Sequence, residues 1–303
     1  MTGPNPQFDR SALFAAIATH AIWGSMPLYL LLVRRVPAVE FVAWRILATL
    51  PLCAAIIAWR GAGNEVREVL RDRKALLTLL ASATLVAVNW TLYVWAINRG
   101  HVYAASLGYY ILPLTMMLLG LVVLGERLTR VQWWAVALAA CGVAALAAGA
   151  LTTLWVSLSL ALTFGLYGLL RKTVNAGPLA GLMVESLILA PFALATVAWF
   201  ALQPVGSAMA HGPGLAASVA LGGPMTAVPL ILFAFAARRL PYTVIGFLQF
   251  ISPTIVFLLG LFVFGEALKP AQLGCFVAIW GAALLFIWDM VRRTRPVAVA
   301  PAA

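Results

Sequence analysis

The chain has 303 residues, of which 64% are hydrophobic and only 10% are charged, and its mean hydropathy is +1.00. Because soluble domains average about 25% charged residues, this composition excludes a water-soluble globular protein and predicts a chain that exposes apolar surface to lipid. The net charge of +11 would suit a nucleic-acid-binding protein, but the cations lie in short gaps between apolar runs, which argues against nucleic acid as a partner.

Ten apolar runs follow one another along the chain, each close to the length of about 20 residues that a helix needs to cross a bilayer. The runs lack the two-residue alternation of barrel strands. The first run is too long for the apolar part of a signal peptide. The sequence therefore predicts an all-α integral membrane protein with ten transmembrane helices, at 13–33, 38–59, 75–97, 103–124, 131–149, 153–170, 179–201, 214–236, 242–264 and 271–290.

The cationic residues predict the orientation, because cytoplasmic loops of membrane proteins carry an excess of Lys and Arg. With the N-terminus in the cytoplasm, fifteen cations fall in cytoplasmic segments and four in outside segments, while Arg45 lies within a span. Both termini are therefore expected in the cytoplasm. The longest polar stretch, 60–74, is expected to lie at the cytoplasmic interface of the membrane.

Two segments 140 positions apart are nearly identical, since LLGLVVLGERL begins at Leu118 and LLGLFVFGEAL begins at Leu258. Matches at this offset or at 141 are not confined to aliphatic residues, since they pair Pro113 with Pro253, Glu126 with Glu266, and Trp23-Gly24 with Phe164-Gly165. The chain is therefore expected to consist of two halves of five spans, 1–150 and 151–303. Because five is odd, the second half would be inverted in the membrane, as in many secondary transporters.

Glu126 and Glu266 each follow a Gly at the end of a span, where Gly commonly terminates a helix. Beyond Glu126, Thr129 and Gln132 form a T-x-x-Q capping box for the next helix, where Pro270 stands in the second copy. A carboxylate there would stabilise the positive end of the following helix. We interpret both Glu residues as parts of structural turns, with gating or ion coupling as the alternative.

The segment 89–136, NWTLYVWAINRGHVYAASLGYYILPLTMMLLGLVVLGERLTRVQWWAV, resembles the RarD proteins of the EamA family in the drug/metabolite transporter superfamily. IWGSMPLY at 22–29 and GFLQFISPTIVFLLGLFVFGE at 246–266 match in the same order. The resemblance implies a ten-helix carrier of the bacterial inner membrane, which exports small metabolites or drugs and is linked to chloramphenicol sensitivity. This chain departs from the family pattern at His20, where an aromatic residue is usual, and at Trp44, where His is frequent.

Ionisable and helix-breaking residues inside spans are candidates for function, because they are costly in lipid. Arg45 and Glu185 each lie about seven residues into a span from opposite sides, hence at different depths. We expect them to face a shared water-filled cavity without forming a salt bridge, with a role in assembly as the alternative. Pro113 and Pro253 each remove a backbone hydrogen bond, which suits helices that rock or present carbonyl groups to a solute.

The other candidates for the substrate cavity are aromatic, imidazole or amide side chains. An aromatic ring beside an amide can hold a flat or amphipathic small molecule, and ordinary helix packing is the alternative for each. They are His20, Trp23, Tyr29, Asn89, Tyr93, Tyr109 and Gln249.

The chain has only three His and three Cys and contains no H-E-x-x-H motif, which argues against an intramembrane enzyme. No cofactor or metal site is visible. The leading hypothesis is a carrier for a small-molecule substrate, and a channel or receptor-like protein is the alternative. Proton coupling through Glu185 and assembly as a homodimer are left open.

Overall fold

The computed structural model describes residues 9–265 and 270–294, and all regular elements in these ranges are helical. Ten helical segments in this part of the chain are long and apolar enough to cross a membrane, as the sequence predicts. They are α1 (Arg10–Leu30), α2 (Ala38–Arg60), α4 (Arg73–Asn98), α5 (Val102–Val122), α6 (Arg130–Ala147), α7 (Leu154–Thr173), α8 (Pro178–Ala201), α9 with α10 (Pro213–Ala220 and Gly222–Ala237), α11 with α12 (Tyr242–Gln249 and Ile251–Phe262) and α13 (Pro270–Thr294). The chain is thus a multi-pass membrane protein.

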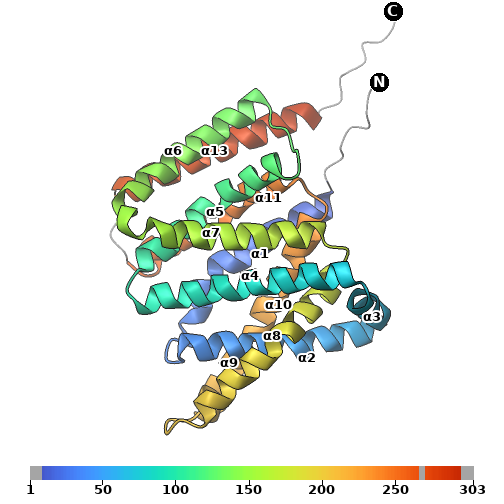
Figure 1. The fold of residues 1–303 in the computed structure, drawn as a ribbon. Coiled ribbons are helices and arrows are strands. Elements are labelled where there is room, and N and C mark those ends of the chain that lie inside the picture. The colour runs from blue at the N-terminus through green and yellow to red at the C-terminus, as the bar shows by residue number, and fades with distance from the viewer. Residues whose placement is uncertain (1–8, 266–269, 295–303) are drawn as a thin grey trace, which may run out of the picture.

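The helices form one bundle in which helices far apart in the sequence lie side by side (Figure 1). At one edge α6 packs on α13, and at the opposite edge α2 packs on α8. Between these edges α5 contacts α7 and α11, α4 contacts α7 and α8, and α1 contacts α10 and α12. The interior is therefore built from helices of both the N-terminal and the C-terminal part of the chain.

Two of the spans are interrupted, and the two equivalent prolines differ in their surroundings. The eighth span divides at Leu221, and the ninth divides at Phe250, three residues before Pro253. By contrast, α5 continues through Pro113. Proline cannot donate to the carbonyl four residues earlier, so the carbonyls of Tyr109 and Gln249 lose their usual helical partner. Tyr109 and Gln249 are both predicted cavity residues.

The polar stretch 60–74 folds around a short amphipathic helix, α3 (Gly63–Arg71). Gly61, with φ +63°, ends α2, and the Asp72 side chain accepts hydrogen bonds from the backbone N–H groups of Lys74 and Ala75 in the first turn of α4. Val69 is buried against α4 and α8, while the charged side chains of α3 face outward. This arrangement fits a helix lying along a membrane surface.

Large apolar side chains cover much of the outer surface. Phe14, Trp134 and Phe192 are each 72% exposed. Apolar exposure on this scale, spread over several helices, is costly in water and natural in lipid. The outer surface is therefore the part of the protein that contacts the bilayer.

Candidate functional site

Glu126 lies in the turn after α5 and binds the start of another helix. Its carboxylate accepts hydrogen bonds from the backbone N–H groups of Tyr242 (2.5 Å) and Thr243 (2.8 Å) at the beginning of α11. The sequence predicts that this carboxylate stabilises the following helix, α6, but its hydrogen bonds go to α11, which packs against α5 and presents its unpaired N–H groups to the carboxylate. The capping box of Thr129 and Gln132 is confirmed at the start of α6. Glu266 lies outside the described residues.

Replacing Glu126 by Ala is expected to lower the free energy of unfolding by about 1–2 kcal/mol, because two N–H groups of α11 lose their acceptor. The thermal unfolding midpoint of the detergent-purified protein measures this loss. Glu68→Ala, at an exposed position of α3, serves as the control. Equal midpoints for the two variants would contradict the capping role.

Arg45 of α2 lies among aromatic side chains and has one hydrogen bond in the described chain. Its Nε donates to the Thr226 hydroxyl of α10 at 2.7 Å, and that hydroxyl donates in turn to the carbonyl of Gly222 at 2.7 Å. The guanidinium carbon lies 5.2 Å from the centre of the Trp90 ring and 5.6 Å from that of Phe41. These distances are in the range of cation–π contacts.

Three of the predicted tyrosines surround the same guanidinium. The hydroxyl groups of Tyr29, Tyr93 and Tyr109 lie within electrostatic range of Arg45. The Tyr93 and Tyr109 rings meet edge to face at 5.9 Å, and Tyr29 donates a hydrogen bond to the carbonyl of Ser218. Tyr109 is 41% exposed, so neighbouring helices do not cover this part of α5 completely. The structure thus brings together four predicted residues from α1, α2, α4 and α5.

We call this group the Arg45 cluster. Its members are Tyr29, Phe41, Arg45, Trp90, Tyr93, Tyr109 and Thr226. Phe41, Trp90 and Thr226 are not among the cavity residues that the sequence predicts.

A second aromatic group contains Trp23 and His20 of α1. The Trp23 ring lies 5.5 Å from that of Phe164, 5.6 Å from that of Phe233 and 5.7 Å from that of His20. His20 is fully buried, and neither of its ring nitrogens has a hydrogen-bond partner within the described residues. Gln249 is likewise buried, and its Oε1 has no partner in the same part of the chain. His20 and Trp23 thus lie in the packed interior around α1, and Gln249 is a buried residue of α11.

Asn89 joins two helices. Its amide nitrogen donates to the carbonyl of Leu160 at 2.8 Å and to the Thr163 hydroxyl at 2.9 Å, both on α7. The amide N–H groups are therefore used in packing α4 against α7. Its assignment to the substrate cavity stays a prediction.

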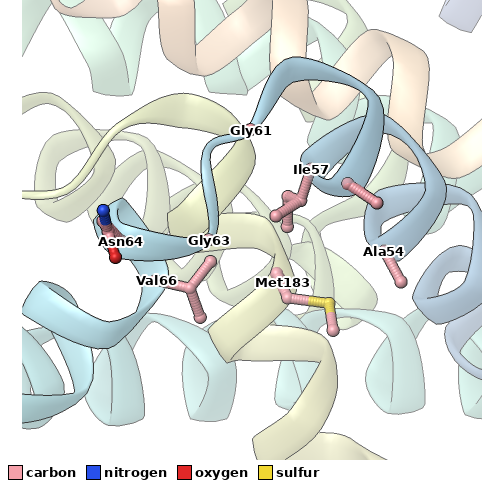
Figure 2. A pocket seen from close by; sticks show the side chains of 8 residues that line it. Ala54, Ile57, Gly61, Gly63, Asn64, Val66 and Met183 are labelled. Atoms are coloured by element: carbon pink, nitrogen blue, oxygen red, sulfur yellow. The ribbon is translucent and has the colours of Figure 1, made fainter.

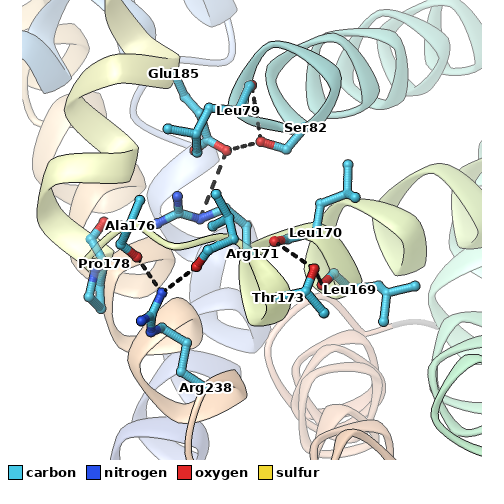
Figure 3. A network of polar contacts seen from close by, with 11 residues as sticks. Leu79, Ser82, Leu169, Leu170, Arg171, Thr173, Ala176, Pro178, Glu185 and Arg238 are labelled. Atoms are coloured by element: carbon cyan, nitrogen blue, oxygen red, sulfur yellow. Dashed lines mark hydrogen bonds and ion pairs between the residues drawn. The ribbon is translucent and has the colours of Figure 1, made fainter. Parts of the chain in front are cut away.

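Glu185 of α8 belongs to a buried polar network at the α3 end of the bundle (Figure 3). It accepts a short hydrogen bond from the Ser82 hydroxyl of α4, and its Oε1 lies 3.8 Å from the Nε of Arg171. The Arg171 and Glu185 side chains are 1% and 3% exposed. Glu185 is thus paired with Arg171 and not with Arg45, and a cavity shared by Arg45 and Glu185 stays a prediction.

The predicted sixth span, 153–170, ends just before Arg171 and leaves it in a cytoplasmic segment, whereas the structure buries this side chain. The helix continues to Thr173, which carries Arg171 into the contact with α8. Its Nη2 donates to the carbonyl of Pro178 at 2.9 Å. In the same region Arg238 donates to the carbonyls of Val174 and Ala176. The only sequence signal was the run of apolar residues immediately before Arg171.

Glu40 near the start of α2 was also missed. Its Oε1 accepts hydrogen bonds from the Ser207 hydroxyl (2.6 Å), the Ala208 backbone N–H (2.8 Å) and the Trp44 indole N–H (3.3 Å). Glu40 thereby ties α2 to η2 (Ala208–Ala210), which lies between α8 and α9. The Trp44 indole N–H is directed to these groups.

Two hollows open on the α3 side of the bundle. The first, of about 510 Å³, is lined by residues of α2, α3 and α8, and Figure 2 shows Ile57, Val66 and Met183 around it. The second, of about 530 Å³, is lined by residues that include Arg73, Lys74 and Leu170. Neither hollow is lined by a predicted site residue, so neither supports a substrate site.

Comparison with known proteins gives consistent matches over nearly the whole chain. A family model described as the EamA-like transporter family matches residues 10–148. The chain is 41% identical over 289 residues to "Protein RarD" of Streptomyces exfoliatus, a match that covers 95% of this chain and 91% of that protein. It is 31% identical over 284 residues to "Chloramphenicol-sensitive protein RarD" of Pseudomonas aeruginosa, covering 92% and 94%.

A solved structure described as "Crystal structure of protein" is similar with a TM-score of 0.72. It covers 93% of this chain and 98% of its own, at 19% sequence identity. At that identity the likeness shows a common fold alone.

Proposed function

The chain belongs to the EamA-like transporter family, and on that premise we propose that it is a secondary carrier that moves small amphipathic metabolites or drugs by alternating access. The observation that carries the proposal is the Arg45 cluster. A guanidinium surrounded by aromatic rings, at the meeting point of α1, α2, α4, α5 and α10, offers both charge and flat apolar surfaces to a solute. Because every member comes from one chain, a homodimer is not required to complete the site.

We propose further that 1–150 and 151–303 are two inverted halves. If each span corresponds to the one five places along, α1 corresponds to α7 and α4 to α10. The contact of α4 with α7 then corresponds to the contact of α10 with α1. In the same way α5 corresponds to α11 with α12, so the contact of α5 with α7 corresponds to the contact of α12 with α1. All four contacts occur, as expected if the two halves are equivalent.

Close contacts at two glycines support the same pairing. A Cβ atom at Gly24 would lie 2.7 Å from the Cβ of Ile255, and one at Gly165 would lie 3.1 Å from the Cγ2 of Thr115. Gly24 pairs with Gly165 at offset 141, and Thr115 with Ile255 at offset 140. Equivalent glycines of α1 and α7 therefore allow the close approach of equivalent helices, α12 and α5. Inverted halves of this kind commonly rock against each other about a central site.

We place the protein in the bacterial inner membrane with both termini and α3 in the cytoplasm, and we propose export as its direction. The excess of cations at the α3 end supports this orientation. The name of the Pseudomonas aeruginosa relative supports a trial of chloramphenicol as a solute.

Uptake of radiolabelled chloramphenicol, phenylalanine and phenylacetate into proteoliposomes tests the carrier proposal. A carrier binds its solute before moving it, so the initial rate for at least one of them is expected to saturate with concentration. A non-saturating flux accompanied by an electrical conductance would instead support a channel. Empty liposomes provide the background rate.

Gly222→Ala is expected to reduce the rate of saturable uptake by about tenfold or more, because it displaces Arg45 without removing any polar group. The new Cβ would lie 2.8 Å from the Arg45 Cγ and 3.2 Å from the Tyr29 hydroxyl oxygen. Gly214→Ala is the matched control, since no atom lies within 4 Å of its Cβ position. Unchanged uptake by the Gly222 variant would place transport away from the Arg45 cluster.

A further inference from the structure

We infer that the Arg45 cluster binds the carboxylate of a small organic monoanion whose flat apolar body lies against Trp90, Tyr93 and Tyr109. The inference rests on the proposed carrier function and narrows its substrate class. Three features of the cluster, as the described residues show it, support the inference: the uncompensated charge of Arg45, the free donors of its guanidinium and the lack of an acidic group.

A cation inside a membrane-spanning helix is costly unless an anion compensates it. Within residues 9–265 and 270–294, no carboxylate forms an ion pair with Arg45. The carboxylates buried or half-buried among the helices are engaged elsewhere: Glu40 with Ser207 and Ala208, Glu126 with α11, Glu185 with Ser82 and Arg171, and Asp289 with Thr129. No carboxylate in these ranges therefore compensates Arg45, which leaves its charge available to an anionic group of the solute.

The hydrogen-bonding groups of Arg45 leave room for this anion. A guanidinium has five N–H donors, and in the described chain only the Nε donor has a partner, Thr226. Because the Thr226 hydroxyl is itself held by the Gly222 carbonyl, the guanidinium plane is fixed. Its two terminal nitrogens remain available on a side chain that is only partly buried. Two parallel N–H groups match the two oxygens of a carboxylate.

The surroundings of Arg45 argue against a zwitterion or a cation as the preferred solute. Among the described residues, the groups near Arg45 are phenols, aromatic rings and one hydroxyl, and none is a carboxylate that could bind an ammonium group. A second cationic group on the solute would be placed near Arg45 without compensation. The site is thus suited to an aromatic or alicyclic monocarboxylate.

Four probes that share a phenyl ring test the inference on the full-length protein in neutral detergent: phenylacetate, phenylacetamide, phenethylamine and phenylalanine. Affinities are measured by tryptophan fluorescence and by isothermal titration calorimetry. Phenylacetate is expected to bind at least about tenfold more tightly than the neutral amide, because a charged hydrogen-bonded pair is formed. Phenethylamine is expected not to bind, and phenylalanine is expected to bind more weakly than phenylacetate.

Variants test whether the preference for phenylacetate over phenylacetamide depends on Arg45. Arg45→Gln is expected to reduce the ratio of the phenylacetate and phenylacetamide affinities to about one, and Arg45→Lys to give an intermediate ratio. Arg34→Gln, in the exposed segment after α1, is expected to preserve the ratio. The comparison of the four probes on the unmodified protein remains decisive even if Arg45→Gln does not fold.

Equal affinities for phenylacetate and phenylacetamide, binding of none of the four probes, or a preference that survives Arg45→Gln would each overturn the inference. Uptake assays distinguish failure of this inference from failure of the proposed carrier function. Saturable uptake of chloramphenicol or phenylalanine, without binding or uptake of phenylacetate, would leave the carrier standing and refute the monoanion. Tight Arg45-dependent binding of phenylacetate without saturable uptake of any solute would refute the carrier alone.

Discussion

Replacing Arg171 by Met alone, or Glu185 by Leu alone, is expected to lower the free energy of unfolding by about 3–5 kcal/mol. Each single change leaves the opposite charge buried without its partner, since the two side chains are 1% and 3% exposed. The double variant is expected to lose far less, because two apolar side chains replace two charges in one packed site. Unfolding in mixed detergent micelles, followed by tryptophan fluorescence, measures the three losses and hence the coupling energy.

The exposed ion pair between Asp9 and Arg239 is the control for this cycle. Its side chains are 37% and 46% exposed, so solvent screens the interaction. Asp9→Asn keeps an N-cap acceptor for α1 and is expected to leave the unfolding midpoint nearly unchanged. If the losses of the two buried single variants simply add in the double variant, Arg171 and Glu185 do not stabilise the fold as a pair.

Gly223→Ala is expected to disrupt the contact between α2 and α10, with a loss of at least about 1–3 kcal/mol in the free energy of unfolding. A Cβ there would lie 2.5 Å from the carbonyl oxygen of Ala48 and 2.7 Å from its carbonyl carbon. These are backbone atoms of α2 and cannot rotate away, so the helices must separate. Because α10 also carries Thr226, saturable uptake is expected to fall together with stability.

Gly274→Ala in α13 is the matched control, since no neighbouring atom lies within 4 Å of its Cβ position. There the higher helix propensity of Ala is expected to raise stability by up to about 1 kcal/mol. Comparison of the two thermal unfolding midpoints gives the cost of the close contact. A Gly223 variant as stable as the Gly274 variant would show that α2 and α10 do not need this close approach.

The ten helices could be predicted because their signal is local. A run of about 20 apolar residues spans a bilayer as a helix whatever its neighbours are. The capping box at Thr129 is local in the same sense, since both of its partners lie within one turn.

The partner of Glu126 could not be predicted. It depends on which helix start lies beside the turn, and Tyr242 is 116 positions away. For the same reason the pattern placed Arg171 in a loop, while packing against α8 buries it.

The candidate site could be predicted in part. Burial cost alone identified Arg45 as a functional candidate, and the ability of aromatic rings in the spans to hold a flat or amphipathic molecule identified Tyr93 and Tyr109. Its hydrogen-bond partner Thr226 is 181 positions away and has no motif of its own. Threonine is common in helices, so only the three-dimensional contact distinguishes this hydroxyl from the others.

The central claim is that the protein is a carrier whose site opens alternately to the two sides of the membrane. Counterflow tests it most directly: proteoliposomes are loaded with a high concentration of an unlabelled solute that shows saturable uptake, and a trace of the labelled solute is added outside. A carrier is expected to concentrate the label inside for a time, because the outward flux of unlabelled solute returns its site to the outer face in exchange. A label that only equilibrates, with no transient accumulation above the outside concentration, would contradict alternating access.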